Sequence, residues 1–271
     1  DRTKAFFAVH LFGLSADMNP ILDLARKYNL FVVEDAACGF GSKYKSEHVG
    51  TFGNAGCFSF HPRKAITTGE GGMVTTSNDS LAEKIRRLRD HGAAMTDLQR
   101  HHGARPYLLA DHPDAGYNQR MTDLQGALGS AQMDRAMGIV SEWHTLASRY
   151  SDAFANLDWL SLPFRHPDYE HGYQSYPCLF TPDEINISTV EQTNKMRNEW
   201  MDKLLKAGVS SRPATHAVHM LKFYREKYKL KPTDFPKAYI ADHCSISLPL
   251  FHGMEQSEQD FVIEKVLEFK N

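Results

Sequence analysis

The sequence predicts an α/β fold in the first half of the chain and a smaller α+β domain after it. Strand-like and helix-like segments alternate up to about residue 92, and this alternation is typical of α/β proteins, whose ligands bind at the carboxyl ends of strands. From about Asp158 the pattern changes to strands accompanied by amphipathic helices. With 271 residues, 42% of them hydrophobic, the chain can bury the core of one large domain or two smaller ones.

The first three predicted elements are a strand, a helix and a strand. Residues 5–11 form a short apolar run, and residues 17–28 ("DMNPILDLARKY") carry apolar side chains at helical spacing, with Pro20 tolerated near the start. Residues 30–34 ("LFVVE") indicate a buried strand whose carboxyl end delivers Asp35 to a glycine-containing loop.

Two further strands, at residues 55–62 and 71–76, flank a segment that contains Lys64. The segment "DSLAEKIRRLRDHG" then predicts a helix capped by Asp79 or Ser80 and terminated by Gly92.

Residues 93–117 are polar and non-periodic, which predicts a long loop, and loops of this length are usually functional or disordered. Residues 122–157 carry one continuous helical pattern that we expect to lead out of the first domain. We therefore predict a large domain over residues 1–150, including this connecting helix, and a small domain over 151–271.

Composition excludes several classes of function. A net charge of −2, with both signs scattered, gives no footprint for nucleic acid or a membrane surface, and no apolar run approaches the roughly 20 residues that span a bilayer. The histidine pairs His101–His102 and His216–His219 match no zinc spacing, so we expect no metal site. The four cysteines lie far apart without a CxxC pair, which indicates reduced thiols in a cytoplasmic protein: Cys38, Cys57, Cys178 and Cys244.

Three residues beside the predicted strands suggest a cofactor. Asp35 is either an active-site acid or a loop-bracing carboxylate, and Lys64 is either a surface cation or a Schiff-base lysine. Ser59 and His61 alternate with phenylalanines and share one face, where Ser59 either contacts a phosphate or is an ordinary buried serine. Together, an acid, a lysine and a hydroxyl beside glycines match the needs of pyridoxal 5′-phosphate.

A generic nucleotide-binding module is the weaker alternative. The glycines of "GTFGNAG" (residues 50–56) are spaced at threes and do not form the dinucleotide fingerprint, and no phosphate-binding P-loop follows any predicted strand.

The block "VVEDAACGFGSKYKSEHVGTFGNAGCFSFHPRKAITTGEGGMVTT" resembles the signature of the DegT/DnrJ/EryC1/StrS family of pyridoxal-phosphate-dependent aminotransferases, which act mostly on nucleotide-linked keto sugars. The resemblance extends to "GYNQRMTDLQGALGSAQMDR" and "SISLPLFHGMEQSEQD" and so covers nearly the whole chain. It implies the aspartate-aminotransferase (fold type I) architecture, with a mixed sheet in the large domain and a smaller C-terminal domain.

The resemblance also implies roles for individual residues. Lys64 forms the Schiff base and moves the proton, Asp35 pairs with the pyridine nitrogen, and Ser59 contacts the phosphate. Asn118, in "GYNQRM", resembles the asparagine that reaches the phosphate from the neighbouring subunit, which implies a homodimer. Cys38 occupies the position, near the phenolic oxygen of the cofactor, where many members have glutamine or histidine.

The segment "SFHPRKAITTGEGG", including His61 as a candidate substrate contact, resembles the branch that aminates C4 of the sugar, with L-glutamate as donor. Arg212, His216 and His219 lie where the family's substrate-facing loop is expected, with a packing or surface role as the alternative. An inosose aminotransferase and a non-catalytic, regulatory homologue are the alternative functions. Because the family's phosphate-cradling turn and ring-stacking aromatic precede the matched region, we expect this chain to be the later part of a longer gene product.

Overall fold

The structure is a computed structural model that describes residues 2–95, 99, 101–103, 105, 107 and 109–270. The predicted loop at 93–117 therefore lies partly outside the described residues. The chain forms two compact units: unit 1 comprises Asp1–Met137 with Asp168–Glu170, and unit 2 comprises Gly138–Pro167 with His171–Asn271.

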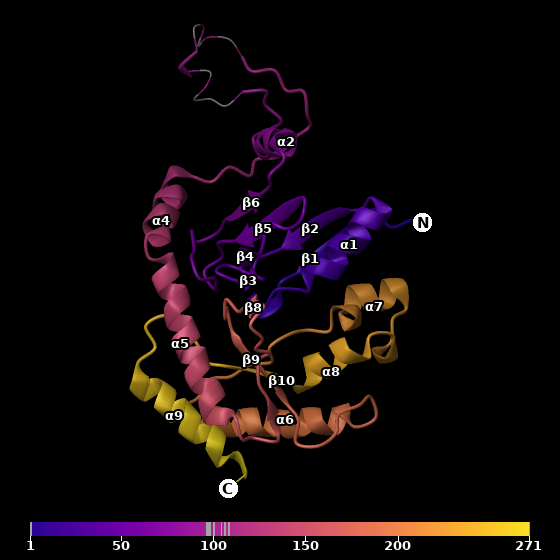
Figure 1. Cartoon of the computed structure of the whole chain (residues 1–271), viewed down its shortest axis with the longest axis vertical. Coiled ribbons are helices and arrows are strands. Elements are labelled where there is room, and N and C mark those ends of the chain that lie inside the picture. Colours follow the sequence, from indigo (N-terminus) through magenta and orange to yellow (C-terminus); the bar gives the residue numbers. More distant parts are fainter. Residues whose placement is uncertain are drawn as a thin grey trace. The chain divides into compact units, whose positions relative to one another are not determined.

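Unit 1 contains the mixed four-stranded sheet expected from the sequence (Figure 1). The strand order is β1-β2-β5-β6, in which β1, β2 and β5 are parallel and β6 is antiparallel to β5. The strands are β1 (Ala5–Val9), β2 (Phe31–Asp35), β5 (Ala55–Ser59) and β6 (Gly72–Thr75).

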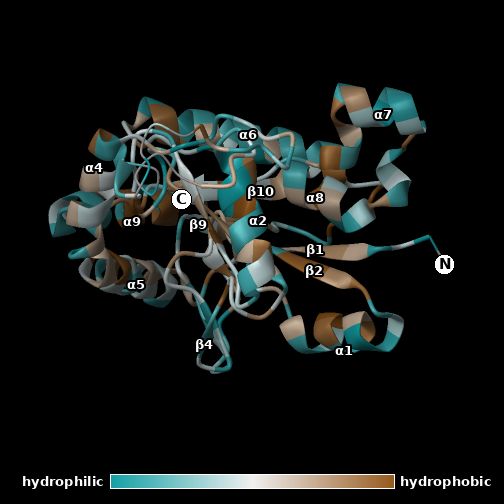
Figure 2. Cartoon of the chain, turned by 90° about the horizontal axis from the view of Figure 1, so that it is seen from above, coloured by the Kyte–Doolittle hydropathy of each residue, from teal (hydrophilic) through white to brown (hydrophobic). Residues whose placement is uncertain are grey.

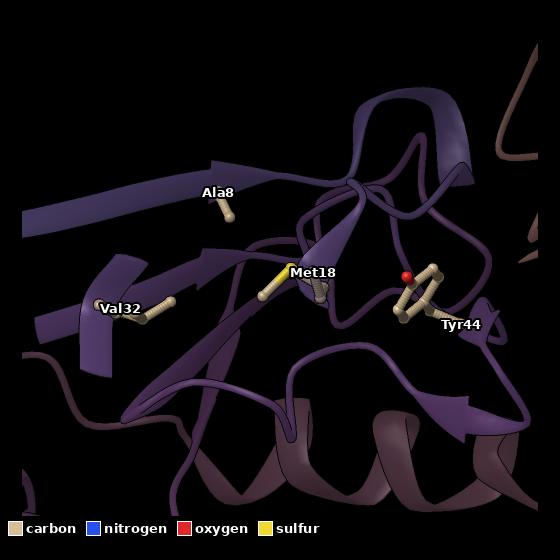
Figure 3. Close-up of a cluster of buried hydrophobic side chains, with 5 residues drawn as sticks. Ala8, Met18, Val32 and Tyr44 are labelled. Carbon is tan, nitrogen blue, oxygen red and sulfur yellow. The ribbon is translucent and has the colours of Figure 1, made fainter. Parts of the chain in front are cut away.

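Helix α1 (Met18–Tyr28) packs on one face of this sheet because its apolar residues fall on one side. Figure 2 shows β1, β2 and part of α1 as hydrophobic. Met18 is fully buried and lies between Val32 and Tyr44 (Figure 3). Truncating such a side chain to alanine costs about 2–5 kcal/mol, so this cluster anchors β2, the strand that carries Asp35.

A second, small sheet of unit 1 was not predicted from the sequence. Its three antiparallel strands have the order β4-β3-β8. Lys45 and Ser46 turn the chain between β3 and β4 with positive φ angles of 48° and 70°, a pairing typical of a two-residue hairpin turn. The strands are β3 (Lys43–Tyr44), β4 (Glu47–His48) and β8 (Tyr169–Glu170).

The helix after β6 begins one residue earlier than expected. Helix α2 (Asp79–Arg89) is capped by Asn78, whose side chain accepts a hydrogen bond from the Leu81 N–H at 2.9 Å, so the prediction of Asp79 or Ser80 as the cap was wrong. Asparagine is as good a cap as aspartate or serine, and helical periodicity alone does not choose between neighbouring polar residues.

The single helix predicted over residues 122–157 is two helices, α4 (Asp123–Met133) and α5 (Ala136–Phe154). At the break, the Arg135 N–H donates to the Gln132 carbonyl at 3.0 Å, a contact one residue shorter than in an α-helix. The apolar spacing continues through this tightened turn, so the sequence pattern does not reveal it.

The units divide near the start of α5, whereas the sequence-based boundary was placed between residues 150 and 151, near its end. The buried side of α5 packs within unit 2. Tyr150 is fully buried, its ring centroid is 5.1 Å from that of Tyr176, and Gln259 donates to the Leu146 carbonyl at 2.7 Å.

Unit 2 is built on the antiparallel sheet β10-β9-β7, and helices accompany these strands, as the sequence predicts for the region after about Asp158. Its core is aromatic, with Trp159, Trp200 and Phe180 in mutual ring contact. The strands are β7 (Leu160–Ser161), β9 (Tyr176–Phe180) and β10 (Ser245–Leu248), and the helices after α5 are α6 (Val190–Lys206), α7 (Lys222–Tyr228), α8 (Pro236–Cys244) and α9 (Gln256–Leu267).

Candidate active site

The parallel strands of unit 1 bring the predicted chemistry to one edge of the sheet. Strands β1, β2 and β5 end at Val9, Asp35 and Ser59. Val9, Asp35 and Cys57 are aligned in register across the three strands. Because side chains alternate along a strand, Asp35 lies on the face opposite to the buried Glu34 and the α1 core.

Asp35 is half-buried and has one oxygen available. Its Oδ1 accepts a hydrogen bond from the Ala37 N–H at 3.1 Å, and no residue in the described part of the chain donates to its Oδ2. Burial raises the pKa of the neighbouring Cys57 thiol, and the negative charge of Asp35 raises it further. The carboxylate therefore offers a free acceptor beside a neutral thiol.

Glu34, directly before Asp35, is fully buried and holds the loop that follows β4. Its Oε1 accepts from the N–H groups of Phe52 and Gly53 at 2.8 and 2.7 Å, and its Oε2 accepts from Gly50 N–H at 2.7 Å and from His10 at 2.9 Å. Burial alone would raise its pKa, but these hydrogen bonds hold the pKa below the ordinary value of 4.5. The glycine-containing segment 50–56 therefore binds the Glu34 carboxylate of the protein itself.

His10 completes this buried network. Its Nδ1 accepts from the Ala16 N–H at 3.1 Å, so the ring proton resides on Nε2, which donates to Glu34. Glycine is required at Gly56, where a Cβ would lie 2.4 Å from the Gly50 carbonyl oxygen. These contacts fix the end of β2 from the side opposite to Asp35.

Lys64 lies beside the loop after Asp35. Its Nζ donates to Cys38 Sγ at 3.1 Å, and its backbone N–H donates to the His61 carbonyl at 2.9 Å, which closes a turn. Lys64 and Cys38 are both half-buried. The structure therefore brings together the predicted lysine and a thiol three residues after the predicted acid.

Two glutamine side chains of α4 pin the segment that carries Lys64. Gln132 accepts from the Thr67 N–H at 3.1 Å and donates to the Thr67 carbonyl at 2.5 Å, and Gln125 donates to the Glu70 carbonyl at 2.9 Å. Sequence reasoning missed both, because nothing in their local pattern points 55 or 65 residues back along the chain.

Ser59 and His61 are joined by one hydrogen bond at the end of β5. The His61 N–H donates to Ser59 Oγ at 3.3 Å, which leaves the hydroxyl proton free to donate. Phe58 and Phe60 instead line an apolar cavity of about 460 Å³ that also touches Met121 and Met133.

Asn118 is exposed and forms an isolated antiparallel bridge with Asp90, just beyond α2. Asp90 in turn accepts from Arg120 at 2.6 Å. Within unit 1, Asn118 is therefore fixed through its backbone, and no described residue bonds its side chain.

The three remaining candidates belong to unit 2. Arg212 is exposed and bridges to Ser247 of β10. His216 is exposed, with its Nδ1 3.9 Å from Asp242. His219 is buried against Phe235, and its Nε2 has no hydrogen-bond partner among the described residues.

The donor set of unit 1 fits pyridoxal 5′-phosphate. Lys64 supplies an amine, Asp35 a carboxylate oxygen free to accept from a ring N–H, and Ser59 a hydroxyl free to donate to a phosphate. Over the described residues, no cluster of His, Cys, Asp or Glu side chains has the geometry of a metal site. No helix in the described part of the chain is long and apolar enough to cross a membrane.

Comparison with known proteins gives a consistent result. The model of the DegT/DnrJ/EryC1/StrS aminotransferase family matches residues 1–267. The chain is 35% identical over 272 residues to the GDP-perosamine synthase of Escherichia coli O157:H7, covering 99% of this chain and 66% of that protein. It is 34% identical over 266 residues to the spore coat polysaccharide biosynthesis protein SpsC of Bacillus subtilis, covering 98% and 66%.

Among solved structures, the aminotransferase from Psychrobacter cryohalolentis matches with a TM-score of 0.87 and 27% identity, over 100% of this chain and 70% of that one. The chain thus spans about two thirds of the length of the relatives that it matches.

Proposed function

Because this chain belongs to the DegT/DnrJ/EryC1/StrS aminotransferase family, we propose that it transfers an amino group from L-glutamate to C4 of a nucleotide-linked keto sugar. Pyridoxal 5′-phosphate is the proposed cofactor. The observation that carries the proposal is the position of Lys64 Nζ, 3.1 Å from Cys38 Sγ and next to the loop that starts at Asp35. An amine and a carboxylate at the carboxyl edge of parallel strands are the two groups that this chemistry needs most.

Pyridoxal 5′-phosphate, when bound, supplies an aldehyde that condenses with amines and a ring that accepts an electron pair. Asp35 Oδ2 would hold a proton on the ring nitrogen, Ser59 Oγ would donate to the phosphate, and Cys38 would face the phenolic oxygen. Glu34 and His10 hold the end of β2 in place, and this fixes the backbone position of Asp35.

Lys64 has two tasks. Its Nζ would be the atom that attaches to the cofactor, and the freed amine would move a proton between the substrate carbon and the cofactor carbon. Gln132 and Gln125 hold the segment from Thr67 to Glu70 by hydrogen bonds. We expect these bonds to restrict the movement of the Lys64 amine.

The substrate assignment rests on the relatives and on sequence pattern. One relative is named GDP-perosamine synthase and another a spore coat polysaccharide biosynthesis protein, which supports a nucleotide-linked sugar. The segment from His61 to Gly72 supports C4. We assign His61, Arg212, His216 and His219 to substrate contacts.

We further propose a cytoplasmic homodimer in which Asn118 reaches the cofactor phosphate of the partner. The exposed position of the Asn118 side chain is consistent with such a reach. The four cysteines, all free thiols, support a reducing compartment.

Borohydride trapping tests the assignment of Lys64. Reduction makes the bond between lysine and cofactor permanent, and we expect the peptide that contains Lys64 to gain the mass of the reduced cofactor. Lys64→Ala should abolish this label while still binding cofactor non-covalently. Lys43→Ala, a matched control that removes a lysine paired with Glu170, should leave the label unchanged. A label on another lysine would show that Lys64 is not the attachment site.

A further inference from the structure

Unit 2 contains a polar cavity of about 250 Å³ at the start of β9 and the end of β10. Four serines, one glutamine and one arginine line it, together with apolar side chains at and after the end of β10. The polar members are Gln174, Ser175, Ser210, Ser211, Arg212 and Ser247.

Backbone pairing holds Arg212 over this cavity. Arg212 and Ser247 exchange two backbone hydrogen bonds, with the Ser247 N–H donating at 2.7 Å and the Arg212 N–H at 3.4 Å. Residues directly opposite in an antiparallel pair project to the same face. The guanidinium and the Ser247 hydroxyl therefore belong to the same side of β10.

The register of the sheet brings Ser175 to the same place. Leu248 pairs with Tyr176, so Ser175, directly before β9, lies at the end of β10 where the chain leaves the sheet. Ser175 and Ser247 are both buried, whereas Arg212 is exposed. The hydroxyls thus form the floor of the cavity and the cation stands at its rim.

Five polar groups of this cavity have no side-chain partner in the described part of the chain. Among the described residues, none of the four serine hydroxyls and no nitrogen of the Arg212 guanidinium has a side-chain hydrogen bond or ion pair, and Ser211 Oγ is completely buried without a partner. Buried polar groups are almost always satisfied, by the protein, by water or by a ligand. Arg212 and Ser210 are exposed and reach solvent, whereas Ser175 and Ser247 are buried, so the unused hydroxyls of these two serines indicate that something outside the chain satisfies them.

Charge and size define what fits. Among the described residues that line the cavity, Arg212 is the only ionisable one and none is a carboxylate, so the cavity attracts an anion. Guanidinium and hydroxyl groups together donate to carboxylate or phosphate oxygens. The cavity is smaller than the roughly 300–1,000 Å³ of a site that encloses a drug-sized ligand, so it takes an end group of a larger molecule.

We propose that this cavity is an oxyanion subsite, in which Arg212 supplies the charge and Ser175 and Ser247 the donors for a carboxylate or phosphate group of a substrate. The identity of that substrate rests on the proposed function, which offers two sources: the carboxylates of the amino donor and the phosphates of the nucleotide sugar.

Calorimetric titration of the protein without added cofactor tests the subsite. The probes are succinate, a dicarboxylate that has no amino group, and inorganic phosphate with GDP. We expect one class to bind, Arg212→Gln to weaken its affinity about tenfold or more, and Ser247→Ala to weaken it about threefold. Arg225→Gln removes the same charge from the exposed surface of α7 and should bind like the wild type.

Binding of succinate through Arg212 would assign the subsite to the amino donor, and binding of phosphate and GDP would assign it to the nucleotide. Failure of both probes to bind, or equal effects of Arg212→Gln and Arg225→Gln, would overturn the proposal. Because Arg212 is exposed, its variant tests the idea even if Ser247→Ala does not fold. Cofactor attachment is measured separately, so a protein that binds the oxyanion but never attaches cofactor would contradict the proposed function and leave the subsite standing.

Discussion

The buried carboxylate of Glu34 gives the sharpest prediction about stability, and the change that probes it is Glu34→Gln. This substitution keeps the shape of the side chain but replaces one acceptor oxygen by an amide nitrogen. Each oxygen of Glu34 accepts two hydrogen bonds, from the Phe52 and Gly53 N–H groups on one side and from His10 and Gly50 on the other. Whichever oxygen is replaced, two donors lose their acceptor: His10 and Gly50, which are buried, or Phe52 and Gly53, which are part-buried.

The size of the effect follows from that count. A buried donor left unsatisfied costs about 1–3 kcal/mol, so the variant should lower the free energy of unfolding of unit 1 by about 2–6 kcal/mol. Glu83→Gln is the matched control in the same unit. Among the described residues, Glu83 pairs only with Arg86, on the exposed surface of α2, and such a pair contributes at most about 0.5 kcal/mol.

Hydrogen exchange read by mass spectrometry separates the units. In Glu34→Gln, the amides of residues 50–53 should lose protection, while Glu83→Gln should leave them unchanged. The three tryptophans all belong to unit 2, so tryptophan fluorescence during urea unfolding reports that unit alone. Unchanged protection at residues 50–53 would show that the carboxylate does not hold this loop.

Acid should reduce the difference in free energy of unfolding between the wild type and Glu34→Gln. Burial raises the pKa of Glu34, but the hydrogen bonds from His10, Gly53 and Gly50 outweigh burial and lower it. The ionised carboxylate therefore stabilises the fold above the ordinary glutamate pKa of 4.5, and this contribution is lost as the pH falls through the lowered value. A difference in free energy of unfolding that grows in acid would contradict the stabilising role of the ionised Glu34 carboxylate.

Three other outcomes follow from the contacts described above. Asp35→Asn should retain cofactor but slow the reaction with L-glutamate about 100-fold or more, measured by stopped-flow absorbance; a normal rate would remove Asp35 from the mechanism. Gln132→Leu should loosen the segment from Thr67 to Glu70, seen as faster amide exchange there and weaker cofactor binding, with no change expected if the two Thr67 contacts are incidental. Burial, with a smaller contribution from His144, lowers the pKa of His171 to about 3, so below pH 6.5 the unfolded chain binds a proton that the folded chain does not bind. The free energy of unfolding of unit 2 should therefore fall by about 2 kcal/mol between pH 6.5 and 5. His171→Phe, monitored by tryptophan fluorescence, should remove most of this pH dependence.

The sequence predicted the elements whose signal is local. The strand ending at Asp35, the helix beginning after Asp17 and the strand pair around Lys64 each carry apolar periodicity or turn residues within a few positions. Chain order and parallel pairing then place the acid and the lysine at one sheet edge, because the carboxyl ends of neighbouring parallel strands coincide.

Contacts between distant segments could not be predicted in this way. The grip of Gln132 on Thr67 depends on how α4 packs, and a glutamine in an amphipathic helix looks like any other polar residue. Glu34 was visible in the sequence only as the neighbour of Asp35, yet its position one residue earlier sends it to the opposite face and into a buried network with His10. The break between α4 and α5 leaves the apolar spacing intact, so the sequence pattern does not predict it either.

The measurement that tests the central claim most directly is the absorbance spectrum of the protein with pyridoxal 5′-phosphate, recorded before and after addition of L-glutamate. The account predicts a band from cofactor attached to Lys64, absent in Lys64→Ala, which glutamate converts to the spectrum of the aminated cofactor. Restoration of the original band by a nucleotide-4-keto sugar would complete the cycle. A protein that binds the cofactor but whose spectrum responds to no amino donor would contradict the account and favour a non-catalytic role.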